Sequence, residues 1–496
     1  MVVSTTETDV LIIGAGLSGV CAACHLERSC PSLSYQIIEA RAQMGGTWDL
    51  FRYPGVRSDS DMHTLGFSFR PWTERKVLAD GASIRRYIKE TAESFGITEH
   101  IRFEQRVTHL SWSTAQGKWT VTVQTPSGTQ HYRARFVMTC AGYYRYDKGY
   151  TPDFEGVDDF QGAVIHPQHW PEDLDYTGKR VVVIGSGATA VTLVPAMSRK
   201  AQHVTMLQRS PTYIFSVPES EADAGLLRRV LPPSLSARFS RWRNALLHLF
   251  FYETTQVFPE QTRRFLIKQV QEALGPDYDV KTHFTPRYRP WEQRLCAVPD
   301  GDLFSAIRDG SASVVTGHIE RFTPSGIQLT TGEAVEADII ITATGLQLQF
   351  LGGATVEVDG VRPEITQSLT YKGMMLSDIP NLMFAIGYTN ASWTLKVDLT
   401  CAYFCRLLRH MASKGYSTCV PRLDARTEAA PLLNLQSGYI ERATHLLPQG
   451  GTRTPWRLYQ NYVLDSVMLR CSRIEDGTME FQRSAATRPS PMAMTS

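Results

Sequence analysis

The sequence predicts an α/β fold with two similar parallel-sheet units, one of them inserted into the other. This prediction rests on one pattern that occurs twice. Residues 9–19 (DVLIIGAGLSG) and 180–190 (RVVVIGSGATA) each read as an apolar strand, a glycine turn and the start of a helix. A second strand follows each helix, at residues 35–39 and 203–209. The pattern is the βαβ unit of a Rossmann-like dinucleotide-binding domain.

Three small positions in each glycine turn have separate roles. The first allows the tight turn, the second lets the backbone approach a pyrophosphate, and the third lets the helix pack closely on the strand. The pyrophosphate then lies on the amides at the helix N-terminus. The positions are Gly14, Gly16 and Gly19 in the first unit and Gly185, Gly187 and Ala190 in the second. Two copies in the same strand–turn–helix context predict two dinucleotides.

The residue that closes the second strand differs in charge between the two units. Glu39 can accept hydrogen bonds from ribose hydroxyls, as in FAD or NAD sites. Arg209 stands at the corresponding place in the second unit, and a cation there suits a ribose 2′-phosphate. The sequence therefore predicts FAD in the first unit and NADPH in the second.

Two further strands give the domain boundaries. Residues 136–142 and 338–345 are apolar strands that end in a small-residue turn, and each marks the chain crossing between the two units. The second unit is therefore expected to lie within the first. The predicted segments are 1–151 for the first part of the FAD-binding domain, 152–337 for the NADP-binding domain with a helical insertion at about 219–278 over the active site, 338–482 for the second part of the FAD-binding domain, and 483–496 for a disordered tail.

Length and composition exclude several classes of protein. The chain has 496 residues and a formal net charge of +2, from 51 Lys and Arg against 49 Asp and Glu. A balance this close to neutral gives no global field for nucleic acid. No stretch approaches the roughly 18 apolar residues of a membrane span, and the polar, acidic first eight residues do not form a signal peptide. With only nine cysteines, an odd number, we expect a cytoplasmic protein.

The placement of cysteines separates the two main classes of flavoprotein that take hydride from a nicotinamide. A disulfide reductase needs a redox-active pair beside the flavin, but residues 44–50 contain no cysteine and none lies between Cys140 and Cys296. Cys21 and Cys24 fall on the first helix, where packing against the sheet explains them. These observations favour a monooxygenase. The thirteen histidines show no ligand spacing, and Cys401 and Cys405 fit a packed helix face, so no metal site is expected.

Several segments carry a resemblance to a known family. The run FQGAVIHPQHWP at residues 160–171 matches the FxGxxxHxxxW(P/D) fingerprint of Baeyer–Villiger monooxygenases. Residues 45–48 (GGTW) and 52–61 (RYPGVRSDSD) are similar to the flavin-side loop of that family. The resemblance extends over about residues 1–482. It is closest to the mycobacterial branch that activates thioamide prodrugs, in the runs FTPRYRPWEQRLC (284–296) and PWRLYQNY (455–462).

The resemblance implies an activity and three catalytic residues. NADPH reduces FAD, O2 forms a C4a-peroxyflavin, and one oxygen atom is inserted next to a ketone carbonyl to give an ester or lactone. Arg294 matches the family's arginine, an always-charged donor for the developing anionic charge. Asp59 matches the acid that pairs with this arginine. His166 matches the fingerprint histidine, for which we expect a linker role that couples domain rotation to the position of NADPH.

Motif and resemblance together also predict the cofactor contacts. The expected FAD contacts are Gly14, Gly16, Ser18, Gly19, Glu39, Thr47, Trp48, Asp49, Leu50, Arg57, Ser58, Asp59 and Val107. The expected NADPH contacts are Gly185, Ser186, Gly187, Ala188, Thr189, Ala190, Val191, Thr192, Arg209 and Ser210. One departure concerns Gln293, because many members have a lysine there that helps bind the 2′-phosphate. The preference for NADPH is therefore expected to be weaker than usual.

The residues leave two rival functions open. The first is an S- or N-oxygenating flavin monooxygenase that acts through hydroperoxyflavin on the same scaffold. The second is a non-catalytic flavin-bound sensor, which would not need Asp59, Arg294 and both glycine turns. The expected small molecules are O2 and a ketone, or a sulfide or thiocarbonyl compound in the first rival. Neither the identity of the substrate nor the oligomeric state follows from the sequence.

Overall fold

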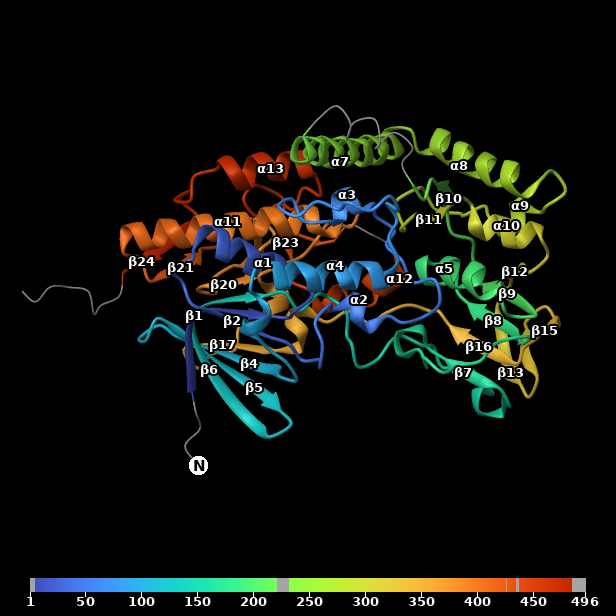
Figure 1. Cartoon of the computed structure of the whole chain (residues 1–496), viewed down its shortest axis with the longest axis horizontal. Helices are drawn as coiled ribbons and strands as arrows, with labels where there is room; N and C mark the ends of the chain where they lie inside the picture. The colour runs from blue at the N-terminus through green and yellow to red at the C-terminus, as the bar shows by residue number, and fades with distance from the viewer. Residues whose placement is uncertain (1–4, 221–231, 425, 434–436, 484–496) are drawn as a thin grey trace, which may run out of the picture.

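The computed structural model describes residues 5–220, 232–424, 426–433 and 437–483. Two sheet units lie side by side, and helices cover them (Figure 1). The predicted tail at 483–496 lies outside the described residues, apart from Arg483.

The larger sheet has ten strands and contains the first glycine turn. Its main path runs β17-β4-β5-β6-β1-β2-β3. Strand β20 pairs with the last residues of β6 and also with β19, and β19 pairs with β18. Strands β1, β2, β3, β6 and β20 are parallel, whereas β4, β5 and β6 form an antiparallel meander. The bounds are β1 Thr5–Ile13, β2 Tyr35–Ile38, β3 Ile101–Arg102, β4 Arg106–Ser113, β5 Lys118–Thr125, β6 Gly128–Thr139, β17 Thr355–Val358, β18 Thr370–Tyr371, β19 Met375–Leu376 and β20 Leu382–Phe384.

The smaller sheet has five strands, all parallel, in the order β12-β9-β8-β16-β7. Runs of Val and Ile buried on both faces, as in β8 and β16, are typical of parallel sheets covered on both sides. The bounds are β7 Ala163–Ile165, β8 Arg180–Ile184, β9 His203–Gln208, β12 Ala312–Thr316 and β16 Ile339–Thr342. Because β16 pairs with β7 and β8, it belongs to this sheet, and the predicted boundary at 337/338 is wrong by one strand.

Short sheets and helices complete the two units. The remaining strands are β10 Ile214–Val217 with β11 Cys296–Pro299, β13 Ile319–Thr323 with β14 Gly326–Leu329 and β15 Ala334–Glu336, β21 Thr418–Pro421 with β24 Met479–Gln482, and β22 Ala429–Ala430 with β23 Gly450–Gly451. The α-helices are α1 Leu17–Ser29, α2 Thr47–Leu50, α3 Met62–Leu65, α4 Gly81–Ser94, α5 Ala188–Met197, α7 Pro233–Val257, α8 Pro259–Leu274, α9 Val280–His283, α10 Asp302–Arg308, α11 Trp393–Lys414, α12 Gly438–Glu441 and α13 Tyr462–Cys471.

Two chain segments connect the sheets and run beside each other. The amide of Arg145 donates to the carbonyl of Gln347 at 2.8 Å, and the amide of Gln349 donates to the carbonyl of Tyr143 at 2.9 Å. The amide of Tyr150 donates to a third carbonyl, that of Gly345, at 3.0 Å. The two crossings therefore form one paired connection rather than two independent linkers.

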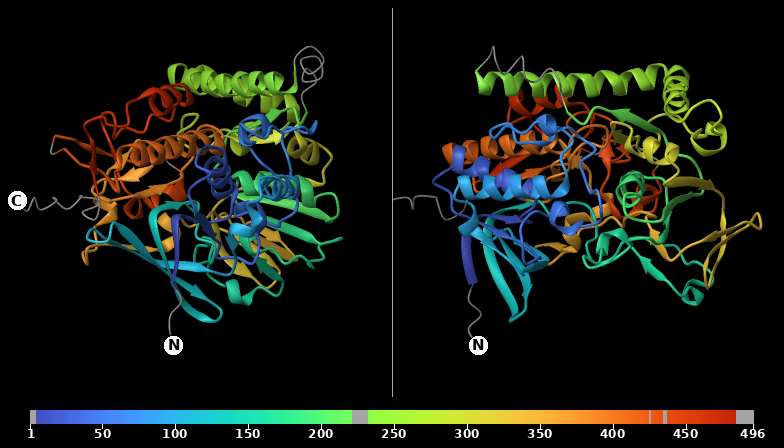
Figure 2. Two further views of the ribbon diagram at one scale, coloured as in Figure 1. Left: turned by 60° about the vertical axis from the view of Figure 1, so that its left-hand side comes forward. Right: turned by 45° about the vertical axis from the view of Figure 1, so that its right-hand side comes forward.

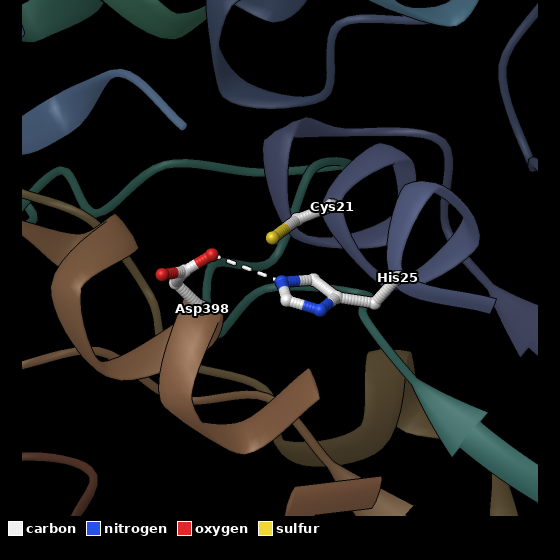
Figure 3. Close-up of side chains that lie close together, drawn as sticks. All are labelled: Cys21, His25 and Asp398. Atoms are coloured by element: carbon white, nitrogen blue, oxygen red, sulfur yellow. Dashed lines mark hydrogen bonds and ion pairs between the residues drawn. The ribbon is translucent and has the colours of Figure 1, made fainter. Parts of the chain in front are cut away.

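Helices α1 and α11, from opposite ends of the chain, pack together through a buried polar cluster (Figure 3). His25 Nε2 lies 2.9 Å from an Asp398 carboxylate oxygen, and Cys21 points toward the same place. Arg241 of α7 approaches the second carboxylate oxygen of Asp398 at 4.0 Å. The cluster contains metal-type ligands, but its histidine and carboxylate already pair with each other, with a guanidinium beside them.

Helices α7 and α8 run along one side of the molecule, outside both sheets (Figures 1 and 2). Each begins with a proline at its first position, Pro233 and Pro259, where the missing N–H costs nothing. They occupy the part of the predicted insertion that the structure describes; residues 221–231 of that segment lie outside it.

Candidate active site

One cavity of about 960 Å³ lies at the carboxyl ends of the parallel strands of both sheets. Its wall includes the turn after β1, the turn after β8 and the segments after β6 and β16. This is where ligands bind in open α/β sheets. The volume is at the upper end of the roughly 300–1,000 Å³ of typical ligand pockets.

Backbone contacts explain the first glycine of each turn. Gly14 has φ of 103°, and a Cβ there would lie 2.6 Å from the carbonyl oxygen of Cys140. Gly185 has φ of 133° and faces the carbonyl of Ala343 in the same way. Both glycines are required because the chain adopts a backbone region that other residues rarely occupy and passes close to the next strand.

The N-termini of α1 and α5 lie at the cavity and have no side-chain cap. The N-cap residues Gly16 and Gly187 have no side chain that could accept from the first-turn N–H groups. A Cβ on Gly187 would meet no protein atom within 4 Å, so the space in front of this turn belongs to the cavity. Two helix N-termini of this kind fit the pyrophosphates of two dinucleotides.

Glu39 reaches the cavity from the end of β2 with both oxygens engaged by backbone. Its carboxylate accepts from the amide of Ala15 at 2.7 Å and from the amide of Arg41 at 2.9 Å. Burial raises the pKa of Glu39, against the opposing effect of these two amides. The contacts fix the carboxylate next to the first glycine turn, where a ribose hydroxyl can reach it.

Two cations line the part of the cavity near the second turn. Arg209 is exposed at the end of β9 and lies on the wall. Arg442, which sequence reasoning missed, lies on the same wall with its guanidinium 3.6 Å from the centre of the Tyr150 ring. Burial lowers the pKa of Arg442, and the charge of Arg209 lowers it further. Both positive charges therefore face the same cavity, where each could contribute to binding a phosphate.

Arg294 and Asp59 meet on the cavity wall, as the resemblance implies. A guanidinium nitrogen of Arg294 lies 3.3 Å from a carboxylate oxygen of Asp59, and 38% of the arginine side chain is exposed. Burial by itself lowers the pKa of this arginine, but the charge of Asp59, together with smaller effects of Tyr439, Tyr143 and Tyr144, raises the pKa above its ordinary value. Arg294 is thus a fixed cation facing the cavity.

Three tyrosines surround this ion pair, and sequence reasoning missed all of them. The hydroxyls of Tyr143 and Tyr144 lie 2.8 Å apart, and the Tyr143 ring stacks on Trp393 at 5.0 Å. Burial raises the pKa of Tyr143, Tyr144 and Tyr439 well above the ordinary value, with added effects of their mutual contacts. All three stay protonated at neutral pH and are available as hydrogen-bond donors beside Arg294.

His166 does not lie on the cavity wall. Its Nε2 is 3.1 Å from the carbonyl oxygen of Gly345, and its Nδ1 accepts from the amide of Gln168 at 3.2 Å. The ring packs over Gly149, where any Cβ would collide with it. Burial lowers the pKa of His166, so the ring is neutral at physiological pH. Its contacts are with the paired connection between the sheets.

Most of the predicted cofactor contacts lie on this wall, and some do not. Those on the wall are Gly14, Gly16, Ser18, Glu39, Thr47, Trp48, Arg57, Ser58, Asp59, Val107, Gly185, Ser186, Gly187, Ala188, Thr189, Arg209, Ser210 and Arg294. The predicted residues away from it are Gly19, Asp49, Leu50, Ala190, Val191 and Thr192, together with His166.

Packing and ion pairs explain why several predicted contacts do not line the cavity. Leu50 and Val191 belong to the core between α5 and its sheet. Asp49 is buried under three arginines, with Arg41 and Arg52 each 2.6 Å from its carboxylate. The expectation of direct cofactor contact is therefore not supported for them. The aromatic side chains of α7 are likewise absent from the wall, whereas Trp393 lies on it.

Comparisons with known proteins identify the class to which this fold and cavity belong. The model of the "Flavin-binding monooxygenase-like" family matches residues 7–225. The chain belongs to this family of class B flavoprotein monooxygenases, enzymes that use FAD and NADPH. The predicted family, fold class, enzyme class and cofactors are confirmed.

Particular relatives narrow the branch. The chain is 52% identical over 492 residues to the FAD-containing monooxygenase EthA of Mycobacterium tuberculosis, covering 99% of this chain and 100% of that protein. It is 48% identical to the probable FAD-binding monooxygenase AlmA of Acinetobacter baylyi, covering 97% of each. It is therefore related to the EthA branch.

Solved structures share the fold at lower identity. An oxidized steroid monooxygenase bound to NADP superposes with a TM-score of 0.74 at 22% identity, covering 96% of this chain and 100% of that one. A cyclohexanone monooxygenase structure gives a TM-score of 0.74 at 20% identity with the same coverage. Among the described residues, none of the helices has the length and apolar character needed to cross a membrane.

Proposed function

We propose that this chain is a Baeyer–Villiger monooxygenase that inserts one oxygen atom of O2 next to a ketone carbonyl. The reaction balances as ketone, O2, NADPH and a proton giving an ester or lactone, NADP⁺ and water. The observation that carries the proposal is the Arg294–Asp59 pair on the wall of a cavity that both glycine turns share.

The residues of the chain have defined tasks in this proposal. When bound, reduced FAD supplies the activation of O2. Arg294 would stabilise negative charge that develops on the substrate carbonyl oxygen, because a charged donor fixed before the reaction needs no reorganisation. Asp59, at 3.3 Å, holds the guanidinium in place. Ser186, Gly187, Arg209 and Ser210 would hold the NADPH phosphates.

Arg442 also bears on the choice of nicotinamide cofactor. Gln293 replaces a lysine that many members use at the 2′-phosphate, but Arg442 lies with Arg209 on the cavity wall. We infer that Arg442 supplies the second cation and that NADPH is preferred over NADH despite Gln293.

A second activity, oxygen transfer to sulfur or nitrogen, is favoured by one observation. Transfer of an electrophilic oxygen requires a proton for the oxygen atom left behind. The hydroxyls of Tyr143, Tyr144 and Tyr439 lie beside Arg294 and stay protonated at neutral pH. One enzyme with these donors could therefore oxidise both ketones and soft heteroatoms.

The experiment that tests the proposal compares matched substrates. Benzyl methyl ketone and benzyl methyl sulfide have nearly the same shape and differ in the group that receives oxygen. Each is incubated with the enzyme, FAD, NADPH and ¹⁸O2, and the products are identified by mass spectrometry. The proposal expects benzyl acetate that contains one ¹⁸O atom.

The outcomes separate the two activities. Labelled ester with or without sulfoxide supports the ketone oxygenase. Sulfoxide without ester contradicts it and assigns the heteroatom activity. Oxidation of NADPH that yields only hydrogen peroxide with both substrates contradicts both activities for substrates of this size.

A further inference from the structure

The turn just before Arg294 places a tryptophan in a backbone conformation that favours glycine. In this turn the amide of Glu292 donates to the carbonyl oxygen of Arg289 at 3.1 Å. Pro290 is the second residue of the turn, and Trp291, the third, has φ of 68°. Proline followed by a residue with positive φ is the pattern of a type II turn, and glycine usually takes the third position. The backbone at Trp291 is therefore strained, because a bulky side chain is disfavoured in this region.

The indole of Trp291 has a second unfavourable feature. Its Nε1 is buried and has no hydrogen-bond partner among the described residues. A buried donor without an acceptor costs free energy. Among the described non-glycine residues with positive φ, Trp291 is the one aromatic residue. Strain of this kind persists only where the surrounding structure holds the residue in place, and it concentrates at functional sites.

A cluster of apolar side chains behind the turn holds Trp291 in place, and we call it the support cluster. Its buried members are Tyr213, Leu266 of α8 and Leu295, and Trp291 packs against them. The Trp291 ring also meets the ring of Tyr252 from α7 edge-on, with 5.6 Å between the ring centres and 75° between the ring planes. These contacts fix a residue whose own backbone and side chain would otherwise favour another conformation.

Helices α7 and α8 thus contact the chain just before Arg294, although they lie outside both sheets (Figure 1). Tyr252 of α7 contacts Trp291, and Arg263 of α8 donates to the carbonyl oxygen of Pro286 at 3.1 Å. Neither Tyr252 nor Trp291 lies on the cavity wall. Any effect of these two side chains on the reaction must therefore pass through the segment that carries Arg294.

Arg294 lies between two fixed points of the backbone. The strained turn ends at Glu292, and β11 begins at Cys296, whose amide donates to the carbonyl oxygen of Tyr213 at 2.9 Å. Between these points Leu295 is 4% exposed and belongs to the support cluster, whereas Arg294 lies on the cavity wall. Burial of Leu295 therefore fixes the backbone from which the Arg294 side chain extends to the cavity.

A long, flexible side chain such as arginine loses much rotamer freedom when it is held in one place. Asp59 holds the guanidinium end at 3.3 Å, but 38% of the Arg294 side chain is exposed. We propose that Trp291 is a positioning residue: the strained turn and its contact with Tyr252 hold Arg294 where it reaches both Asp59 and the substrate. This inference rests on the role of Arg294 in the proposed function and extends that site to residues behind the cavity wall.

The test compares four variants of the FAD-loaded full-length enzyme. Trp291→Gly keeps the turn, because glycine accepts positive φ, and removes the indole. Trp291→Phe restores a ring, and Tyr252→Leu removes the aromatic contact from the side of α7. The matched control is Phe251→Ala, since Phe251 is the neighbour of Tyr252 on α7 and packs against the same cluster, where its ring lies 6.1 Å from that of Phe215. Flavin absorbance and flavin reduction by NADPH verify that each variant folds.

The quantity measured is the rate of ¹⁸O-labelled ester formation from benzyl methyl ketone. A misplacement of about 1 Å can cost roughly 100-fold in rate. The proposal expects Trp291→Gly to lower kcat about tenfold with an unchanged KM for the ketone, as for an interaction made only in the transition state. Trp291→Phe should stay within about threefold of the wild type and Phe251→Ala within about twofold, with Tyr252→Leu between Trp291→Gly and the control.

A double variant separates positioning from general stability. If Trp291 acts through Arg294, Trp291→Gly should change the remaining rate of Arg294→Ala by less than about twofold. A further loss of about tenfold in this background, or equal losses in Trp291→Gly and Phe251→Ala, would overturn the inference. Sulfoxide without ester from the wild type would instead overturn the proposed function, and sulfoxide formation from benzyl methyl sulfide by the same variants then decides on Trp291 by the same thresholds.

Discussion

Replacing Arg294 by alanine should separate flavin reduction from oxygen insertion. The change removes the cation that faces the cavity and leaves Asp59 as an unneutralised negative charge at the same place. Reduction by NADPH should persist, because the second glycine turn and Arg209 remain. Ester formation should fall because the developing carbonyl charge loses its donor.

The expected size of this loss follows from the geometry. Removing one preorganised donor typically costs a factor of about 10²–10³ in kcat. A charge-assisted bond is roughly twice as strong as a neutral one, which moves the estimate upward. The side chain is 38% exposed, and screening by water moves it downward. We therefore expect a loss of about 300-fold, or roughly 3 kcal/mol of transition-state stabilisation.

The assay measures the two half-reactions separately. Anaerobic mixing with NADPH, followed by flavin absorbance, gives the rate of reduction, and ¹⁸O-labelled ester gives the rate of insertion. Arg294→Lys retains the charge without the planar fork and should recover part of the rate. Arg85→Ala is the control, because Arg85 pairs with Asp49 at 3.3 Å and does not line the cavity. Ester formation by Arg294→Ala at the wild-type rate would refute the reasoning.

Three further predictions concern the cofactor site and stability. Gly187→Asp should abolish reduction by NADPH while the protein stays yellow. The added carboxylate would project into the cavity at the N-terminus of α5, where it would repel the NADPH phosphates. Anaerobic stopped flow measures the rate of reduction, and persistent reduction would contradict the assignment of NADPH to the second unit. Arg442→Gln should lower the kcat/KM ratio of NADPH to NADH by about tenfold, and an unchanged ratio in steady-state kinetics would contradict its role at the phosphate. Burial alone would lower the pKa of His25, but its contacts with Asp398 raise that pKa to about 10. The protonated ring therefore stabilises the fold fully below its unfolded pKa of about 6.5, and this stability is lost as the pH rises toward 10. Thermal unfolding of the wild type should therefore shift downward between pH 7 and 9.5 relative to a His25→Gln variant, and parallel pH profiles would contradict the assignment.

Local patterns in the sequence predicted both dinucleotide-binding units, and the family resemblance predicted the charged pair in the cavity. The two glycine turns and the strands before them depend on neighbouring residues, and the structure has them where the pattern predicts. The pairing of Arg294 with Asp59 came from the family resemblance and is present at 3.3 Å. The expected boundary at 337/338 failed because strand partners are non-local: β16 pairs with β8, more than 150 residues earlier.

Features that depend on distant residues could not be predicted. Tyr439 lies near Tyr143 and Arg294 although it is nearly 300 and nearly 150 residues away from them in the chain, and no spacing indicates this. The orientation of α7 is another example. Its segment was expected over the active site, but Arg241 binds the carbonyl end of α3, and the aromatic side chains of α7 do not lie on the cavity wall.

The contact between α1 and α11 has a consequence for synthesis of the chain. His25 and Asp398 are 373 residues apart. At about 5–20 residues per second, the ribosome needs roughly 20–75 s to supply the partner of α1. The five-stranded sheet needs only residues between β7 and β16 and can form earlier. During that interval the second sheet can already be complete while the first unit still lacks its last strands and α11, so we expect the apolar strands of the first unit to be most exposed to aggregation then.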